Sequence, residues 1–313
     1  MEWSLVLEVR GKSSMQADYP KVVIVILNWD GLLDTLECLR SVQKITYPNF
    51  TVLVVDNGSK GNDAEVIRRK FEDFVCIIKI EKNLGFTGGA NVGIRWALRS
   101  GAKYVFLLNN DTIVDPNVLT ELVNVSQNDT QIGIVGPKIY YYEKSNRIYC
   151  VGGRVNFWTG TAPIIGAREI DDGQFDTIKE VDYVGMLLIK EKTIKTIGLF
   201  SDIYFTYYSD TEWCVKARKA GFKVVYVPKA RIWHKSHDEK KSSANALVVY
   251  YMTRNRFLFV KRNSNALQFI VFNLYFLTTD LLPKMMSALF MRPNLVLAYL
   301  KGIYAGLYLV VHN

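Results

Sequence analysis

The stretch Tyr104 to Thr112, YVFLLNNDT, decides the fold of this chain. Its apolar half is short and uninterrupted, which is typical of a buried strand, and it ends abruptly in Asn109, Asn110 and Asp111. An acidic group at the carboxyl end of a buried strand is well placed to hold a divalent cation against a phosphate ligand. The stretch therefore predicts an α/β sheet with a polar site at its edge.

Three more strand-like runs come before this stretch and alternate with segments of helical periodicity. The runs are Val22 to Leu27, Thr51 to Asp56 and Val75 to Ile80. Such alternation predicts a mostly parallel sheet with crossover helices, in which ligands bind beyond the carboxyl ends of the strands. We therefore expect the polar residues that end the strands to meet at one edge. These residues are Asn28, Asp56, Asn83 and Asp111.

Length and cysteine usage favour one catalytic domain from a reducing compartment. The 313 residues include 4 cysteines without close spacing, so neither a zinc ribbon nor a redox Cys-x-x-Cys pair is available. The first 20 residues carry Glu2 and no long apolar core, which argues against a secretory signal. We expect an N-terminal extension at 1–20, a catalytic domain at 21–262, a distinct C-terminal segment at 263–313, and a cytoplasmic location.

Basic charge is concentrated in the C-terminal third. Residues 213 to 313 contain 16 Lys or Arg and 3 Asp or Glu, whereas residues 1 to 212 contain 23 and 27. The same region holds two apolar stretches, Leu267 to Leu282 and Leu295 to Val311, which are unusual in proteins that bind nucleic acid. Both are at the short end for crossing a bilayer, so helices lying on the cytosolic membrane face fit better. The alternatives are helices that pack on the catalytic domain or form a homo-oligomer interface.

A glycine-rich segment, Asn83 to Gly93, follows the third strand and opens a helix. Its backbone is able to approach a diphosphate closely, and its amides face negative charge. It is neither a Walker A loop nor a dinucleotide-binding fingerprint. The turn Asp56 to Ser59 suits a base or ribose but is also an ordinary turn. Both segments leave a nucleotide role and a structural role open.

Two carboxylates, Asp210 and Glu212, lie within the aromatic segment Tyr204 to Cys214. At a helix start one of them caps backbone amides while the other projects into a cleft, where burial raises its proton affinity. A carboxylate so placed acts as a general base. The alternative is a pair of ordinary acids favoured by the helix dipole. His234 leaves a similar choice between a metal or phosphate contact and a structural histidine.

A series of motifs resembles family 2 glycosyltransferases, in the branch that includes rhamnosyltransferase-like enzymes. In order they are VVIVILNWDG, VVDNGS, NLGFTGGANVG, LLNNDT, VDYVGMLLIK, FTYYSDTEWCVKARKAG, IWH and YYMTRNR. The resemblance covers roughly residues 20 to 262. It implies a GT-A type Rossmann-like fold, a nucleoside diphosphate sugar donor, a divalent metal (Mg or Mn), and transfer of the sugar with inversion to a glycan or lipid-linked saccharide.

The resemblance also assigns residues to the donor site. Asp111 stands where the family has the last acid of Asp-x-Asp, and it would hold the metal on the diphosphate, with His234 as a further contact. Asp56 would hydrogen-bond the base. The other donor-site residues are Leu27, Asn28, Asn83, Gly85, Asn91, Asn109, Asn110, Gly185 and Met186.

On the acceptor side the resemblance assigns Asp210 as general base, with Glu212 as support. Three positions depart from the family pattern: Asn109 replaces the first acid of Asp-x-Asp, Ser209 replaces a common Glu, and Ala90 replaces a basic residue of some relatives. Metal affinity is therefore expected to be modest, and the base lacks a neighbouring carboxylate.

Two other functional classes remain open at this point. A nucleotidyltransferase would share the nucleotide site, and a noncatalytic membrane or carbohydrate-binding protein would share the apolar C-terminal segment. The donor is left open among dTDP-rhamnose, a UDP-hexose, UDP-galactofuranose and GDP-mannose. The transferase hypothesis makes one geometric prediction: Asp111 and Asp210 flank a single cleft.

Overall fold

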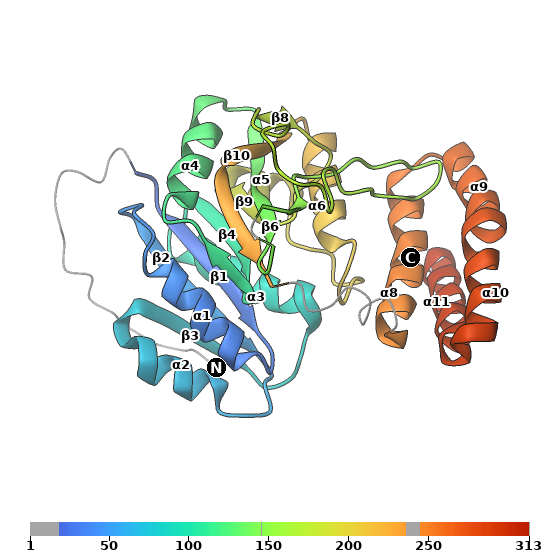
Figure 1. Cartoon of the computed structure of the whole chain (residues 1–313), viewed down its shortest axis with the longest axis horizontal. Helices are drawn as coiled ribbons and strands as arrows, with labels where there is room; N and C mark the ends of the chain where they lie inside the picture. The colour runs from blue at the N-terminus through green and yellow to red at the C-terminus, as the bar shows by residue number, and fades with distance from the viewer. Residues whose placement is uncertain (1–18, 145, 236–244, 313) are drawn as a thin grey trace.

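The computed structural model describes residues 19–144, 146–235 and 245–312 (Figure 1). The predicted extension at 1–20 lies almost wholly outside these ranges. A single mixed sheet forms the centre, with strand order β3-β2-β1-β4-β9-β6-β10-β5. Two short strands, β7 and β8, pair with β6 and β10 respectively. The α/β architecture predicted from the alternating sequence is confirmed.

The first half of the sheet is parallel, as predicted. It consists of β1 (Val22–Asn28), β2 (Phe50–Asn57), β3 (Val75–Ile80) and β4 (Tyr104–Asn109). Register places Asn28 beside Asp56 and Leu27 beside Asn109, so the carboxyl ends of three strands share one edge. The expected convergence of strand ends is therefore present in the backbone.

The second half of the sheet is mixed. It contains β5 (Thr112–Val114), β6 (Ile132–Tyr141), β7 (Ile148–Cys150), β8 (Lys179–Glu180), β9 (Leu187–Lys190) and β10 (Lys223–His234). Strand β9 lies between β4 and β6 and is antiparallel to both. Strand β10 runs parallel to β6, while β5 is antiparallel to β10. This arrangement brings the end of β10 beside the residues that follow β4.

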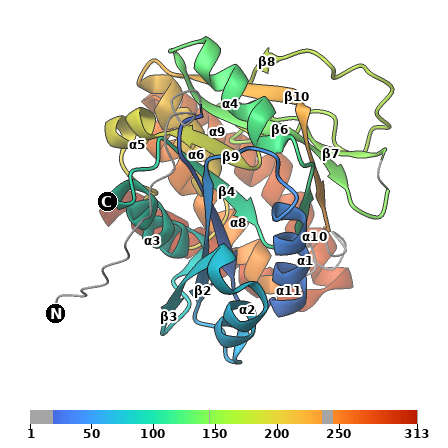
Figure 2. The ribbon, with the colours of Figure 1, turned by 90° about the vertical axis from the view of Figure 1, so that its left-hand side faces the viewer.

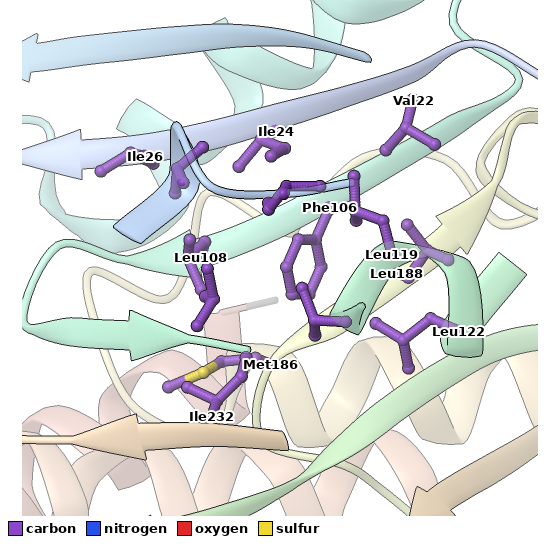
Figure 3. Close-up of a cluster of buried hydrophobic side chains, with 14 of the residues drawn as sticks. Val22, Ile24, Ile26, Phe106, Leu108, Leu119, Leu122, Met186, Leu188 and Ile232 are labelled. Carbon is purple, nitrogen blue, oxygen red and sulfur yellow. The ribbon is translucent and has the colours of Figure 1, made fainter. Parts of the chain in front are cut away.

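Helices cover both faces of the sheet, since alternate side chains of each strand point to opposite faces. Residues Val22, Ile24 and Ile26 belong to one buried cluster, together with Phe106, Leu108 and Met186 (Figure 3). Residues Val23 and Val25 belong to the cluster on the other face. Helices α1 (Leu32–Val42), α2 (Asp63–Phe71) and α4 (Val118–Asn128) cover the first face. Helices α3 (Gly85–Arg99), α5 (Glu191–Ile197) and α6 (Ser209–Lys219) cover the second, and Figure 2 shows α1 and α3 on opposite sides.

The C-terminal part is a helical layer at one end of the molecule (Figure 1). It contains α8 (Ala246–Asn263), α9 (Ala266–Tyr275), a π-helical turn η3 (Phe276–Leu281), α10 (Leu282–Met291) and α11 (Pro293–His312). A third buried cluster joins Val215 of α6 to Phe257 of α8 and Phe272 of α9. Helix α8 therefore contacts both the α/β part and the later helices. The boundary predicted at 262/263 falls at the end of α8 and stays a prediction.

Helices α8 and α11 approach each other closely at two glycines. A Cβ atom at Gly302 would lie 2.9 Å from the carbonyl oxygen of Tyr250, and one at Gly306 would lie 3.2 Å from that of Arg254. Residues larger than glycine would hold the helices apart. The spacing of the two glycines, one helical turn apart, thus sets the distance between α11 and α8.

Candidate active site

A cavity of about 210 Å³ opens at the shared strand edge. Its polar wall is the sequence Asn109–Asn110–Asp111, which begins at the last residue of β4. Its apolar wall comes from β1, α3 and β4, with Val25, Leu27, Phe86, Ala90, Leu107 and Leu108. The sequence-predicted residues Leu27, Asn109, Asn110 and Asp111 therefore lie around one cavity.

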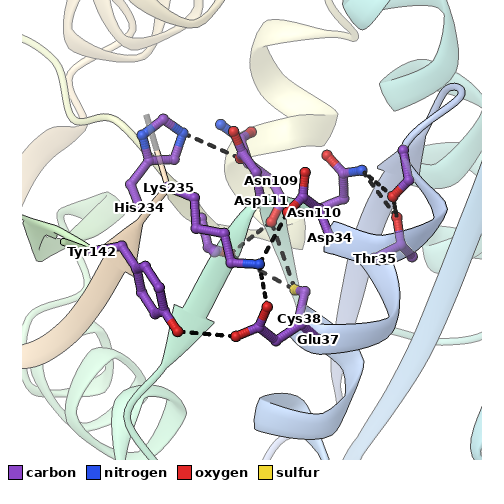
Figure 4. A network of polar contacts seen from close by, with 12 residues as sticks. Asp34, Thr35, Glu37, Cys38, Asn109, Asn110, Asp111, Tyr142, His234 and Lys235 are labelled. Carbon is purple, nitrogen blue, oxygen red and sulfur yellow. Dashed lines mark hydrogen bonds and ion pairs between the residues drawn. The ribbon is translucent and has the colours of Figure 1, made fainter. Parts of the chain in front are cut away.

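Asp111 and His234 meet beside this cavity, because β5 pairs with the end of β10 and sets Thr112 opposite His234. The Oδ1 atom of Asp111 lies 3.2 Å from Nε2 of His234 (Figure 4). The backbone amide of Lys235 donates to the Asp111 carbonyl at 2.9 Å, which fixes this corner further. Nδ1 of His234 is buried without a hydrogen-bond partner in the described residues.

These two side chains suit a divalent cation whose coordination is completed by a ligand. A carboxylate oxygen and an imidazole nitrogen only 3.2 Å apart can face the same ion. No group of three or more His, Cys, Asp or Glu that could hold a metal occurs within the described ranges. Magnesium is commonly held by one or two carboxylates plus substrate phosphates, so a protein contribution of two ligands is sufficient.

Asn28 and Asp56, at the ends of β1 and β2, differ in whether a side-chain atom is left without a hydrogen-bond partner. Asn28 is fully buried, donates to Asp63 at 3.0 Å and accepts from Thr35 at 2.8 Å. The Oδ1 atom of Asp56 accepts from the Ser59 amide at 3.3 Å, whereas its Oδ2 atom is buried with no partner in the described part of the chain. Asn28 is thus engaged within the protein, and Asp56 keeps an acceptor for a ligand.

The glycine-rich segment holds a second loop in place. Asn83 accepts from the Gly85 amide at 2.7 Å, and Asn91 exchanges two hydrogen bonds of 3.0 Å with the backbone of Phe200. Gly85 has a left-handed φ of +73°, and a Cβ atom there would lie 2.3 Å from the Phe205 carbonyl oxygen. Gly85 and Asn91 therefore contact the 200–205 segment, whereas Asn83 accepts from Gly85 and from the Asn57 side chain. Contact with a diphosphate stays a prediction for all three.

Gly185 and Met186 precede β9, which lies next to β4. Register pairs Leu107 with Leu187, so Gly185 reaches the level of the polar strand end. Gly185 is exposed, whereas the Met186 side chain is buried with Leu108 and Ile232 (Figure 3). Only Gly185 of this pair presents surface to a ligand, and Met186 contributes to the core.

Asp210 stands in the first turn of α6. Its Oδ1 atom accepts from the Thr211 amide at 2.8 Å. Burial raises the pKa of the Asp210 carboxyl, and hydrogen bonds from Thr211 offset part of this effect. Burial, with a smaller contribution from the charge of Asp210, also raises the pKa of Cys150 to about 11. Asp210 is not among the residues that line the cavity beside Asn109 to Asp111, so the prediction that Asp111 and Asp210 flank a single cleft stays a prediction.

Glu212 occupies a different environment from Asp210. Its side chain is only 2% exposed and accepts from Nε of Arg262 at 2.8 Å and from the Tyr204 hydroxyl at 3.2 Å. Lys216, one turn further along α6, lies 3.4 Å away. The carboxylate is therefore neutralised within the protein and joins α6 to α8.

Sequence reasoning missed Lys235. Its ammonium group lies 3.0 Å from Asp34 and forms a second ion pair with Glu37, both on α1, and Tyr142 also donates to Glu37 (Figure 4). This contact spans 201 positions, so no local pattern reveals it. Its neighbour His234 was the one available signal. Lys235 ties the end of β10, and with it His234, to α1.

Comparisons with known proteins agree with this geometry. The model of glycosyl transferase family 2 matches residues 22–181. The dTDP-rhamnosyl transferase RfbF of Shigella flexneri is 24% identical over 90% of this chain and 95% of its own length. The low-salt glycan biosynthesis hexosyltransferase Agl10 of Haloferax volcanii is 26% identical over 75% of this chain and 74% of its own.

Solved structures share the fold at low identity. The mannosyltransferase PcManGT from Pyrobaculum calidifontis, in complex with GDP-Man and Mn²⁺, superposes with a TM-score of 0.61 at 13% identity, covering 93% of this chain and 88% of that one. GalNAc-T7 with UDP, GalNAc and Mn²⁺ gives 0.57 at 17% identity, covering 70% and 44%. The fold is of GT-A type. Because the family model covers the first four strands and the residues that line the cavity, this chain belongs to glycosyl transferase family 2.

Proposed function

We propose that the protein transfers a sugar, with inversion, from a nucleoside diphosphate sugar to a hydroxyl group of a glycan or lipid-linked saccharide. The observation that carries this proposal is the pairing of Asp111 with His234 beside the cavity. Asp210, in the first turn of α6, is proposed to complete this cleft from the acceptor side. Family membership supports the reaction class.

Asp111 and His234 are proposed to hold a divalent ion, Mg or Mn, and Asn109 with Asn110 to line the donor site. A cation bound there would offset the negative charge that grows on the departing diphosphate. Oδ2 of Asp56, which is buried and has no hydrogen-bond partner in the described residues, is proposed to accept from an N–H donor of the base. Asn28 contributes indirectly, because its amide donates to both Asp63 and Ser59 and thereby orders the strand ends.

Asp210 is proposed to remove the proton from the acceptor hydroxyl. A sugar hydroxyl is a weak nucleophile, and a carboxylate whose pKa is raised by burial is a better base than an exposed one. One base is sufficient for direct displacement, which inverts the anomeric centre without a covalent intermediate. Glu212 is assigned a supporting role in holding α6 against α8, because its carboxylate already accepts hydrogen bonds from Arg262 and Tyr204.

The C-terminal helices are proposed to lie on the cytosolic face of a membrane. Residues Ala266–Phe290 are long and apolar enough to cross a membrane by length and composition. However, Asp280 near their middle pairs with Arg256 of α8, and Arg256 also donates to the carbonyls of Thr159 and Gly160. These contacts hold the helix against the α/β part. Its opposite side exposes Leu267, Ile270, Leu274, Leu277, Leu282, Met286, Leu289 and Phe290.

A thermal-shift screen tests the donor site directly, because a ligand that binds the folded form raises its stability. The panel is dTDP-rhamnose, UDP-glucose, UDP-galactofuranose and GDP-mannose, each with and without Mn²⁺. We expect one member to raise the melting temperature, and to do so more strongly with Mn²⁺. Asp111→Asn should abolish the Mn²⁺-dependent part. An equal response in that variant would overturn the metal assignment.

A further inference from the structure

Two consecutive tyrosines before Asp210 have an unusual backbone. Tyr207 and Tyr208 have φ angles of 60° and 64°, in the left-handed region that residues other than glycine rarely adopt. Tyr208 is the residue that precedes α6, and its carbonyl accepts the first helical hydrogen bond, from Glu212, at 2.8 Å. Such a conformation persists only where surrounding contacts impose it. The turn that they hold lies immediately before Asp210 in the chain.

Those contacts come from α8. The side-chain amide of Asn255 donates to the carbonyl of Thr206 at 2.5 Å and to that of Tyr207 at 3.1 Å. Its own carbonyl oxygen accepts from Nε of Arg254 at 2.8 Å, and Arg254 donates to the Ile203 carbonyl at 2.9 Å. Asn255 is fully buried. These bonds join the turn before α6 directly to α8.

The same face of α8 contacts the whole segment from Phe205 to Glu212. Tyr251 stacks on Phe205 with ring centroids 5.4 Å apart, and Phe259 packs against Tyr208 at 5.3 Å. One turn further, Arg262 reaches Glu212. The spacing of these residues is that of one helix face, and their contacts follow residues 205 to 212 in order. Phe205 also presses against Gly85, so the segment is held from the glycine-rich side as well.

We propose that Asn255 is a positioning residue for the catalytic base: by holding the carbonyls of Thr206 and Tyr207, it fixes the left-handed turn that aims Asp210 at the acceptor. The C-terminal helical layer thus supplies part of the active site through α8. This inference rests on the proposed role of Asp210. It assigns no contact between Asn255 and substrate.

The test uses the full-length protein and whichever nucleotide sugar of the panel raises its melting temperature. Turnover is measured as release of the nucleoside diphosphate when the sugar is transferred to water or to an added acceptor glycan. Asn255→Ala should lower kcat about 30-fold while changing the donor KM less than twofold, because the donor site is built from other elements. Asn273→Ala is the matched control: that side chain donates to Phe269 of its own helix, and kcat should stay within twofold.

A double-variant comparison separates positioning from general loss of structure. If Asn255 acts through Asp210, adding Asn255→Ala to Asp210→Asn causes little further loss of kcat, since residues that act as a unit are not additive. A multiplicative loss, or an unchanged kcat in Asn255→Ala, overturns the inference. If Asn255→Ala does not fold, Asn255→Gln, which keeps the amide but displaces it, should still lower kcat with KM preserved, and an unchanged kcat overturns the inference equally. Full activity of Asp210→Asn would instead defeat the proposed base and leave the fold of the turn intact.

Discussion

At the residue scale, the most informative contrast is between Asp210 and Glu212. They are two positions apart on one helix, so their side chains cannot share a face. Asp210 accepts from the Thr211 amide at the start of α6, whereas Glu212 is neutralised by Arg262. Proximity in sequence suggested one catalytic pair, but helix geometry separates the two carboxylates. What the sequence alone did not reveal is the ion pair of Glu212 with Arg262, which lies 50 positions further along the chain.

The raised pKa of Asp210 gives a prediction for stability. Burial makes the neutral form easier to hold than the ionised one, so stability from this group is present at low pH and is lost as the pH rises through its raised pKa. Asp210→Asn removes the buried charge and should stabilise the protein at pH 7 by about 1 kcal/mol. The same variant should lower kcat about 100-fold or more, as loss of a general base does.

Thermal unfolding across pH checks this prediction. The melting temperature of Asp210→Asn should exceed that of the parent protein at pH 7, and the difference should shrink as the pH falls toward 4. Asp73→Asn, at an exposed position in the η2 turn (Glu72–Phe74), serves as the control and should show no such trend. A variant less stable than the parent at pH 7 would show that the Asp210 carboxylate is favoured in its ionised form.

His234 carries a second prediction at this scale. Its Nε2 atom faces Asp111, and Lys235 fixes the strand end from the other side. His234→Gln keeps a polar side chain of similar reach but replaces the imidazole ligand. We expect it to raise, about tenfold, the Mn²⁺ concentration at which the selected nucleotide sugar gives half of its Mn²⁺-dependent stabilisation. Stabilisation without Mn²⁺ should be unchanged. Titration of the melting temperature with Mn²⁺ measures this, and identical midpoints would remove His234 from the metal site.

At the scale of elements, the parallel half of the sheet was predictable and the mixed half was not. Strands β1, β2 and β4 read as continuous apolar runs because both of their faces are buried. Strand β9 has four residues and is inserted between β4 and β6 from much later in the chain. Strand β8 has two. Runs so short carry no periodic signal, and their partners are set by long-range packing. The position of Gly185 beside the site therefore emerged only with the fold.

The close contact between α8 and α11 gives a prediction at the same scale. A side chain at Gly302 would press on the Tyr250 carbonyl, so Gly302→Ile should destabilise the helical layer by about 2 kcal/mol, in the range of overpacked cores. Because α8 also carries Asn255, kcat should fall as well. The midpoint of urea unfolding measures the first effect. Lys301→Ala, at the neighbouring exposed position, is the control and should leave both quantities within experimental error.

At the scale of the whole molecule, the helical layer contacts the turn before Asp210 on one side and exposes apolar side chains on the other. One side of α8 holds the turn before Asp210, and beyond it α9 and α10 expose a row of large apolar side chains. Leu267, Ile270 and Leu274 are 58 to 62% exposed and follow one another at helical spacing. Lys284, half exposed on the same helical run, and the basic composition of this region favour anionic lipid. An acceptor held at the membrane surface would then reach a base whose position depends on the same layer.

Replacement of Leu267, Ile270 and Leu274 by Gln tests this arrangement, because all three side chains are exposed. Like other surface substitutions, the change should leave the melting temperature within about 2 °C. We expect co-sedimentation with vesicles of phosphatidylglycerol and phosphatidylcholine to fall at least fivefold, while donor-induced stabilisation is retained. Vesicles of phosphatidylcholine alone should bind the parent protein less than the anionic ones. Release of the parent protein by alkaline carbonate distinguishes a surface helix from a spanning one, since only the former is extracted. Unchanged sedimentation of the triple variant, accompanied by a shift from dimer to monomer in solution, would instead assign the exposed row to contact between two copies of the chain.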